Sequence, residues 1–250
     1  MKTLFAVSFM VGIFVVSGLT VCMAEMWPLK IERVDVLSQG QMFMSAGLAY
    51  EKNREYMGNE YDNVRLAPFG LRYGLGDSVE AGGFLSYSSN SANDDGAPDK
   101  SGLEGVTFFG KLSINNNFAI QVGGTFLGDD SVAPYANDGL DIFVNVPMQL
   151  KLGQGMLYGQ FGYRVQGGDY DGTSYFNYGI GYGKPFSKQL ALNVELVGEE
   201  FQKGTHNTLD LVLGGNYLAN NKVSLLPYIS FGLYDDSPDF SLGCLLNLMF

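Results

Sequence analysis

The last eleven residues of the chain, Phe240 to Phe250, carry an apolar side chain at every second position. Side chains in a β-strand point alternately to opposite faces, so this spacing places six of them on one face of a single strand. These six residues are Phe240, Leu242, Cys244, Leu246, Leu248 and Phe250. The pattern predicts a strand that turns one whole face toward an apolar core or toward lipid.

The start of the chain has the pattern of an export signal. A short basic start precedes an apolar run over residues 4–19, so residues 1–24 are predicted to be a signal peptide that is cleaved after Ala24. The run is shorter than the about 20 apolar residues that a transmembrane helix needs. Residues 25–39 are then expected to form a short N-terminal periplasmic segment, with room for at most a small plug.

The rest of the chain, residues 40–250, repeats segments of roughly ten to fourteen residues, each long enough to cross a bilayer as a tilted strand. The clearest lies at 139–152, where apolar and polar residues alternate. We therefore predict an all-β fold, a transmembrane antiparallel up-and-down β-barrel of about twelve strands. The expected strands are 40–50, 62–75, 78–89, 103–114, 117–127, 139–152, 155–166, 173–184, 188–199, 207–218, 222–234 and 239–250.

Composition agrees with a barrel. The chain has 34 glycines and only 16% charged residues, whereas a soluble domain is usually about a quarter charged. Short predicted turns, such as Gly153-Gln154, alternate with longer loops, such as 51–61 and 90–102. With an even number of strands the short turns are expected in the periplasm and the long loops outside.

Polar side chains on the other face of these strands are expected to point into the barrel. An Arg or Lys that faced lipid at mid-depth would cost about 2 to 4 kcal/mol, so charges in the strands favour the interior. Two interpretations remain open: the charges line a water-filled pore, or they pair with one another as scaffold and close the lumen. The predicted lumen-lining residues are Arg72, Glu80, Lys111, Asp141, Asn145, Gln149, Lys151, Arg164, Glu195 and Asp210.

Aromatic residues also occur on the predicted inner face. They suit contact with an aromatic or aliphatic solute and equally suit packing inside the barrel. These candidate solute-contacting residues are Phe43, Phe84, Phe109, Phe143, Tyr158, Tyr175 and Tyr228.

The sequence predicts no catalytic residue, metal site or cofactor, and the net charge of -11 does not favour nucleic acid as a partner. The single histidine, His206, lies in a predicted outer loop, and no serine has a place beside it that would make a nucleophilic site. We therefore expect a protein that is not an enzyme. An outer-membrane hydrolase is the least favoured alternative.

Three segments resemble one known family. They are FGLRYGLGDSVEAGGFLSYS at 69–88, LNVELVGE at 192–199 and GLYDDSPDFSLGCLLNLMF at 232–250. These segments are similar to outer-membrane barrels assigned as transporters of the meta pathway of phenol degradation, which share the Arg-Tyr-Gly strand, the following glutamate strand and the Ser-Pro-Asp turn. The ending Leu-Met-Phe departs from the Tyr-Arg-Phe ending usual in that family.

The resemblance implies a bacterial outer-membrane channel or facilitator for passive passage of small solutes, including aromatic or hydrophobic ones. The terminal Phe250 resembles the insertion signal of outer-membrane barrels, so the expected partners are outer-membrane lipid, lipopolysaccharide, a small-molecule solute and the barrel-assembly machinery, which would act on the C-terminal strand. The principal alternative is a non-transporting structural or surface-interaction barrel with its lumen closed by ion pairs.

Overall fold

The computed structural model describes residues 28–56, 59–93, 99–126, 128, 139–167, 174–202 and 207–250. The predicted signal peptide and His206 lie outside these residues. The described residues contain no helix with both the length and the hydropathy needed to span a membrane. The strands are β1 (Met42–Tyr56), β2 (Asn59–Gly74), β3 (Val79–Ala92), β4 (Lys100–Asn115), β5 (Phe118–Phe126), β6 (Asp141–Leu152), β7 (Gly155–Val165), β8 (Tyr175–Pro185), β9 (Leu190–Phe201), β10 (Thr208–Asn220), β11 (Val223–Gly232) and β12 (Phe240–Met249).

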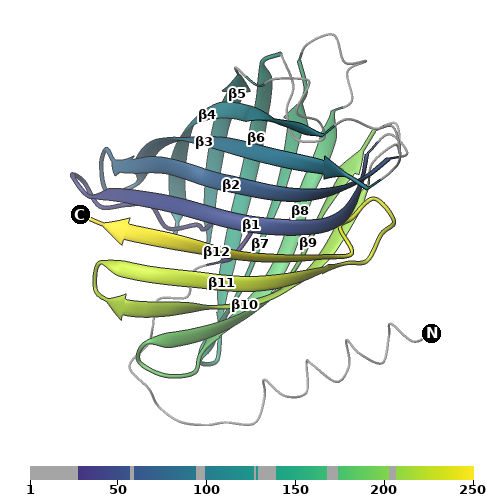
Figure 1. Cartoon of the computed structure of the whole chain (residues 1–250). Coiled ribbons are helices and arrows are strands. Elements are labelled where there is room, and N and C mark those ends of the chain that lie inside the picture. Colours follow the sequence, from purple (N-terminus) through teal and green to yellow (C-terminus); the bar gives the residue numbers. More distant parts are fainter. Residues whose placement is uncertain are drawn as a thin grey trace.

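The strands close into one antiparallel barrel. Each pairs with its neighbours along the chain, and β1 pairs with β12 to complete the circle (Figure 1). At this closing seam Met44 lies opposite Leu248, and Tyr50 lies opposite Leu242. The predicted fold class, a twelve-stranded up-and-down barrel, is confirmed.

The barrel is apolar outside and polar inside. Leu48 and Ile180 on the outer face are 58% and 55% exposed, whereas Glu80 and Lys111 on the inner face are 0% and 1% exposed. A soluble protein has the opposite arrangement, since water would meet the apolar side chains. An apolar outer band around a polar interior is the architecture of barrels that span the bacterial outer membrane. The chain is a barrel of this kind.

The two ends of the barrel differ. At one end, which we call the turn end, β2 and β3, β6 and β7, and the other hairpins of that side are joined by short turns, and Phe250 pairs with Met42 there. At the opposite loop end the strands extend further than expected, because β1 continues to Tyr56 and β2 begins at Asn59 within the predicted loop 51–61. Asp62 holds this extension, since it accepts hydrogen bonds from the hydroxyl of Tyr50 at 2.8 Å and the backbone of Asn53 at 3.1 Å.

β2 and β4 each contain a bulge. Beyond the bulge the alternation is shifted by one residue, so the side chains that would have faced lipid face the interior. The register of β2 shifts between Leu66 and Phe69, and that of β4 shifts at Gly105, which has a φ of 155°. As a result Arg65 and Glu104 both face the interior and form a bidentate pair, with 2.8 Å from Nε to Oε1 and 2.7 Å from Nη2 to Oε2. Strict alternation from Arg72 or Lys111 would have turned both side chains toward lipid, and for this reason the sequence analysis missed them.

Candidate functional site inside the barrel

Residues 28–38, here called the inner segment, lie inside the barrel. Leu29, Ile31, Val34 and Leu37 are all buried, the most exposed of them at 6%. Residues 25–39 are predicted to form a short periplasmic segment with room for at most a small plug, but residues 28–38 of this range occupy the lumen. The physical reason is that these four apolar side chains would meet water in the periplasm, whereas the barrel wall buries them.

Glu195, at the middle of β9, binds the start of the inner segment. Its Oε1 accepts a hydrogen bond from the backbone N–H of Leu29 at 2.6 Å, and its Oε2 accepts one from Lys30 at 2.9 Å. The hydroxyl of Tyr158 on β7 donates to the same carboxylate at 2.8 Å. Lys30 itself pairs with Asp210, close to the loop end of β10, at 3.4 Å. The inner segment therefore begins near mid-barrel, with the ammonium of Lys30 at Asp210 toward the loop end.

Further contacts follow the segment toward the turn end. Gln160 Oε1 accepts from the backbone N–H of Glu32 at 2.7 Å. Glu80, the second residue of β3, accepts from the backbone N–H of Leu37 at 2.9 Å. Wall side chains thus accept hydrogen bonds from main-chain N–H groups that would otherwise be buried without a partner.

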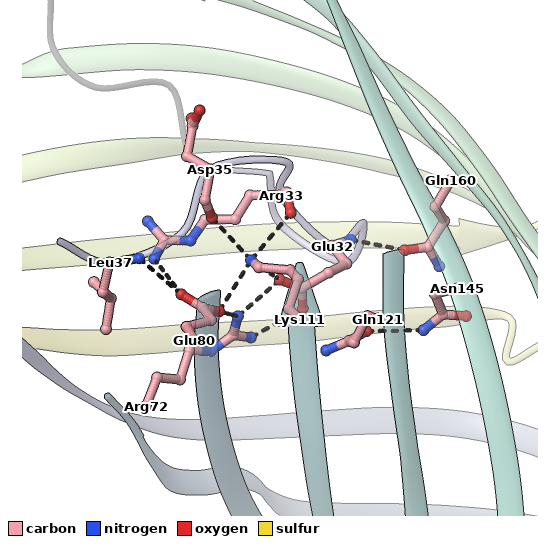
Figure 2. A network of polar contacts seen from close by, with 10 residues as sticks. All are labelled: Glu32, Arg33, Asp35, Leu37, Arg72, Glu80, Lys111, Gln121, Asn145 and Gln160. Carbon is pink, nitrogen blue, oxygen red and sulfur yellow. Dashed lines mark hydrogen bonds and ion pairs between the residues drawn. The ribbon is translucent and has the colours of Figure 1, made fainter. Parts of the chain in front are cut away.

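Lys111 is the centre of a charged cluster, which Figure 2 shows together with its neighbours. Its Nζ lies 3.0 Å from Glu80 Oε1 and 3.1 Å from Glu32 Oε1. The same ammonium donates to the backbone carbonyls of Arg33 at 3.2 Å and Asp35 at 2.8 Å. One fully buried cation on the wall therefore binds two carboxylates and two main-chain carbonyls.

Two arginines complete this charged cluster, which we define as Glu32, Arg33, Arg72, Glu80 and Lys111. Arg72 holds Glu32 with both terminal nitrogens, at 2.7 and 3.0 Å, and lies 3.2 Å from Glu80. Arg33 of the inner segment lies 3.5 Å from the other oxygen of Glu80. Burial opposes ionisation of Glu32, but the charges and hydrogen bonds of Arg72 and Lys111 outweigh it and lower the pKa of Glu32 well below its ordinary value. The carboxylate thus stays charged at ordinary pH.

Apolar contacts also hold the first part of the inner segment, at Leu29 and Ile31. Leu29 forms a buried cluster with Val212 on β10 and Leu226 on β11. Two wall glycines make room for these side chains, because a Cβ at Gly214 would lie 2.8 Å from Leu29 and a Cβ at Gly179 would lie 2.8 Å from Ile31. The wall is therefore shaped to the apolar residues of the segment as well as to its charges.

A cavity of about 630 Å³ lies in the barrel interior, bordered by the start of the inner segment and reaching Glu55 and Asp236 near the loop end. Its wall carries the Arg65–Glu104 pair and also Arg164, which lies 3.7 Å from Asp141. This volume is within the range of about 300 to 1,000 Å³ typical of small-molecule sites.

Guanidinium groups lie over aromatic rings along this cavity. Arg72 is 5.1 Å from the ring centroid of Phe109. Arg164 is 5.3 Å from that of Phe143 and 5.8 Å from that of Tyr175. Each of these distances is within the about 6 Å range of a cation–π contact. The cavity wall therefore places aromatic rings beside arginines that are themselves paired with carboxylates.

The structure brings most of the predicted lumen residues to the inner face. Glu80 and Lys111 belong to the charged cluster together with Arg72, and Glu195 binds the inner segment. Gln149 lies toward the turn end and donates to Asp35 at 3.2 Å. The cavity is lined by the following predicted residues: Arg72, Asp141, Asn145, Arg164, Asp210, Phe43, Phe84, Phe109, Phe143, Tyr175 and Tyr228.

Two predicted residues are placed otherwise. Tyr158 is buried but contacts Glu195 instead of lining the cavity. Lys151 is the next-to-last residue of β6 and is exposed at the turn end, away from the cavity. Its place in the lumen stays a prediction.

Sequence reasoning did not identify the inner segment as part of the site. Glu32 and Arg33 lie before the first strand, where alternation gives no information, although the apolar residues around them signal burial. Among the described residues no group of three His, Cys, Asp or Glu side chains could hold a metal ion. His206 is outside the described ranges, so the structure gives no geometry for the hydrolase alternative.

Solved structures share the barrel fold. An outer membrane channel from Pseudomonas putida F1 aligns with a TM-score of 0.68 at 13% identity, over 89% of this chain and 100% of its own. The β domain of the Bordetella autotransporter BrkA aligns with a TM-score of 0.60 at 11% identity, over 85% of this chain and 100% of its own. The translocator domain of the autotransporter NalP from Neisseria meningitidis aligns with 0.54 at 14% identity, over 87% and 90%.

Likeness at these identities concerns the fold. No family model matches the chain, and no curated protein sequence matches it. The comparisons therefore support an outer-membrane β-barrel, and the resemblance to the phenol-pathway family stays a prediction.

Proposed function

We propose that the chain is an outer-membrane channel that lets small solutes pass by diffusion. The observation that carries this proposal is the cavity of about 630 Å³, which a barrel packed throughout with side chains would not contain. Its lining combines charged groups, amides and aromatic rings, as expected of a site that a solute occupies in passing.

Small aromatic solutes with a polar group are the class that we propose, because aromatic rings, amides and charged groups border the cavity together. Phe143 and Tyr175 flank Arg164, so a flat solute ring could stack near these two rings while its polar group contacts the Arg164–Asp141 pair. The resemblance of residues 69–88 to the phenol-pathway transporters supports the same class.

A second candidate function is a barrel that transports nothing and serves as a structural or surface-interaction protein. The charged cluster favours it, because Glu80 and Lys111 are completely buried in ion pairs at the turn end. A sealed lumen would show no discrete openings in planar bilayers, whereas a channel would show them.

Removal of one ring from the cavity tests the proposed solute class. We expect Phe143→Ala to lower the ratio of 4-hydroxybenzoate flux to gluconate flux into proteoliposomes, because an aromatic contact is lost while both solutes carry one negative charge. The matched control is Phe108→Ala, which removes a ring from the lipid face, where Phe108 is 56% exposed.

An unchanged flux ratio in Phe143→Ala would exclude a role for that ring in solute choice. Absence of flux for both solutes in the wild-type protein would exclude the channel itself and favour the sealed barrel.

The expected partners follow from the same proposal. Outer-membrane lipid meets the apolar band, and a solute would occupy the cavity. Recognition of the C-terminal strand by the barrel-assembly machinery stays a prediction, for which Phe250 supplies an exposed aromatic ring beside Met42.

A further inference from the structure

We propose that the inner face of this barrel is a binding site for a bent peptide segment, and that residues 28–38, which bend at 29–31 and at 34, are its tethered, exchangeable occupant. The occupant would regulate the passage of solutes through the lumen. The proposal therefore rests on the channel function proposed above. The ligand class is a short oligopeptide with a defined pattern of apolar and charged residues.

The wall recognises the main chain of its occupant. Glu195, Gln160 and Glu80, from three separate strands, accept hydrogen bonds from backbone N–H groups of the inner segment. Lys111 donates to two of its backbone carbonyls. Because every peptide offers these donors and acceptors, the contacts define a site for a polypeptide chain.

Side-chain contacts then select the peptide. Gly214 and Gly179 leave space for Leu29 and Ile31, two residues apart, and a carboxylate must follow at the position of Glu32. Without that carboxylate the wall would hold the buried cations of Arg72 and Lys111 against Glu80 alone, and an unpaired buried charge is costly. Lys30, between the two apolar residues, pairs with Asp210, so the required pattern is apolar, basic, apolar, acidic.

The inner segment is joined to the wall in a way that permits exchange. Residues 28–38 belong to no strand, so their contacts could break without breaking a ladder of the barrel. Ser38, Gln39 and Gly40, which connect the segment to β1, are exposed at the turn end. The link between occupant and barrel is thus accessible, whereas the four apolar residues Leu29, Ile31, Val34 and Leu37 of the occupant are buried.

The test is to cut this link and exchange the occupant. A protease site is inserted between Gln39 and Gly40 of the full chain, the folded protein is cleaved in proteoliposomes, and a fluorescent synthetic peptide of residues 28–38 is added. We expect the peptide to bind, measured by fluorescence anisotropy, and to lower the single-channel conductance that rises after cleavage and washing. A variant that lacks residues 28–38 is titrated in parallel, so that slow release of the cleaved segment does not hide binding.

The control peptide carries Glu32→Lys, which places a fourth cation in the charged cluster beside Arg33, Arg72 and Lys111. We expect it to bind at least about tenfold more weakly, since like charges would meet in a desolvated site. The proposal is overturned when neither peptide binds the deletion variant, or when both bind equally. Solute flux through that variant without peptide is a separate readout, so the channel function survives or fails independently.

Discussion

Lys111→Met is expected to lower the free energy of unfolding by about 3 to 5 kcal/mol, the usual cost of removing one partner from a buried ion pair. The ammonium of Lys111 binds Glu32 and Glu80 and two main-chain carbonyls, and it is only 1% exposed. Methionine fills a similar volume but offers none of these contacts, so two carboxylates share the cations that remain. Equilibrium unfolding in urea, with the protein in lipid vesicles, measures the loss.

The control is Lys151→Met, which removes the same charge from an exposed strand end and is expected to change stability by less than about 0.5 kcal/mol. The deletion of residues 28–38 adds a second comparison. In that background Lys111 is hydrated and lacks Glu32, so its substitution should cost much less. Equal losses for Lys111→Met and Lys151→Met would show that the charged cluster does not hold the interior together.

Deletion of residues 28–38 is expected to raise the single-channel conductance several-fold. The segment fills the space between Glu195 at mid-barrel and Glu80 at the turn end, and its apolar side chains are buried there. Water and ions would replace it, because the wall it leaves behind carries charged and amide side chains. Recordings in planar bilayers, with wild type and deletion in the same salt, measure the change.

A matched variant tests whether the side-chain contacts of residues 28–38, or merely a chain of that length, limit the conductance. Replacement of residues 28–38 by an equally long Gly-Ser segment removes every side-chain contact but keeps the chain, and a flexible segment of this kind has no fixed position. We expect its conductance to fluctuate between wild-type and deletion levels. A deletion variant that conducts like the wild type would mean that the segment does not limit passage.

The alternation of apolar residues predicted the fold well, because the membrane imposes it along the whole barrel. In β12, for example, Leu242 and Leu246 are exposed on the outer face as the spacing required, while Ser241 and Asn247 are buried inside. Hydrocarbon penalises a charge on the outer face strongly, so polar residues in a strand report their own orientation.

The interior was less predictable, because it depends on contacts between distant parts of the chain. Alternation could not place Arg65 and Glu104, since bulges near Pro68 and Gly105 shift the phase of their strands. A signal for these bulges was present in the sequence: Arg65 and Glu104 each break the apolar and polar alternation of their strand near a proline or a glycine. No period describes residues 28–38, and their course follows from contacts with buried acceptors, cations and apolar side chains of the wall.

The most direct test of this account is the accessibility of the inner segment in the folded protein. Cysteine is introduced at Val34, which is 1% exposed, or at Ser38, which is exposed, in a background with Cys22→Ser and Cys244→Ser. We measure labelling by a charged, membrane-impermeant maleimide added from the turn end, before and after unfolding. The account predicts that Ser38→Cys reacts readily and that Val34→Cys reacts only after unfolding. Equal reaction rates at both positions in the folded barrel would contradict it.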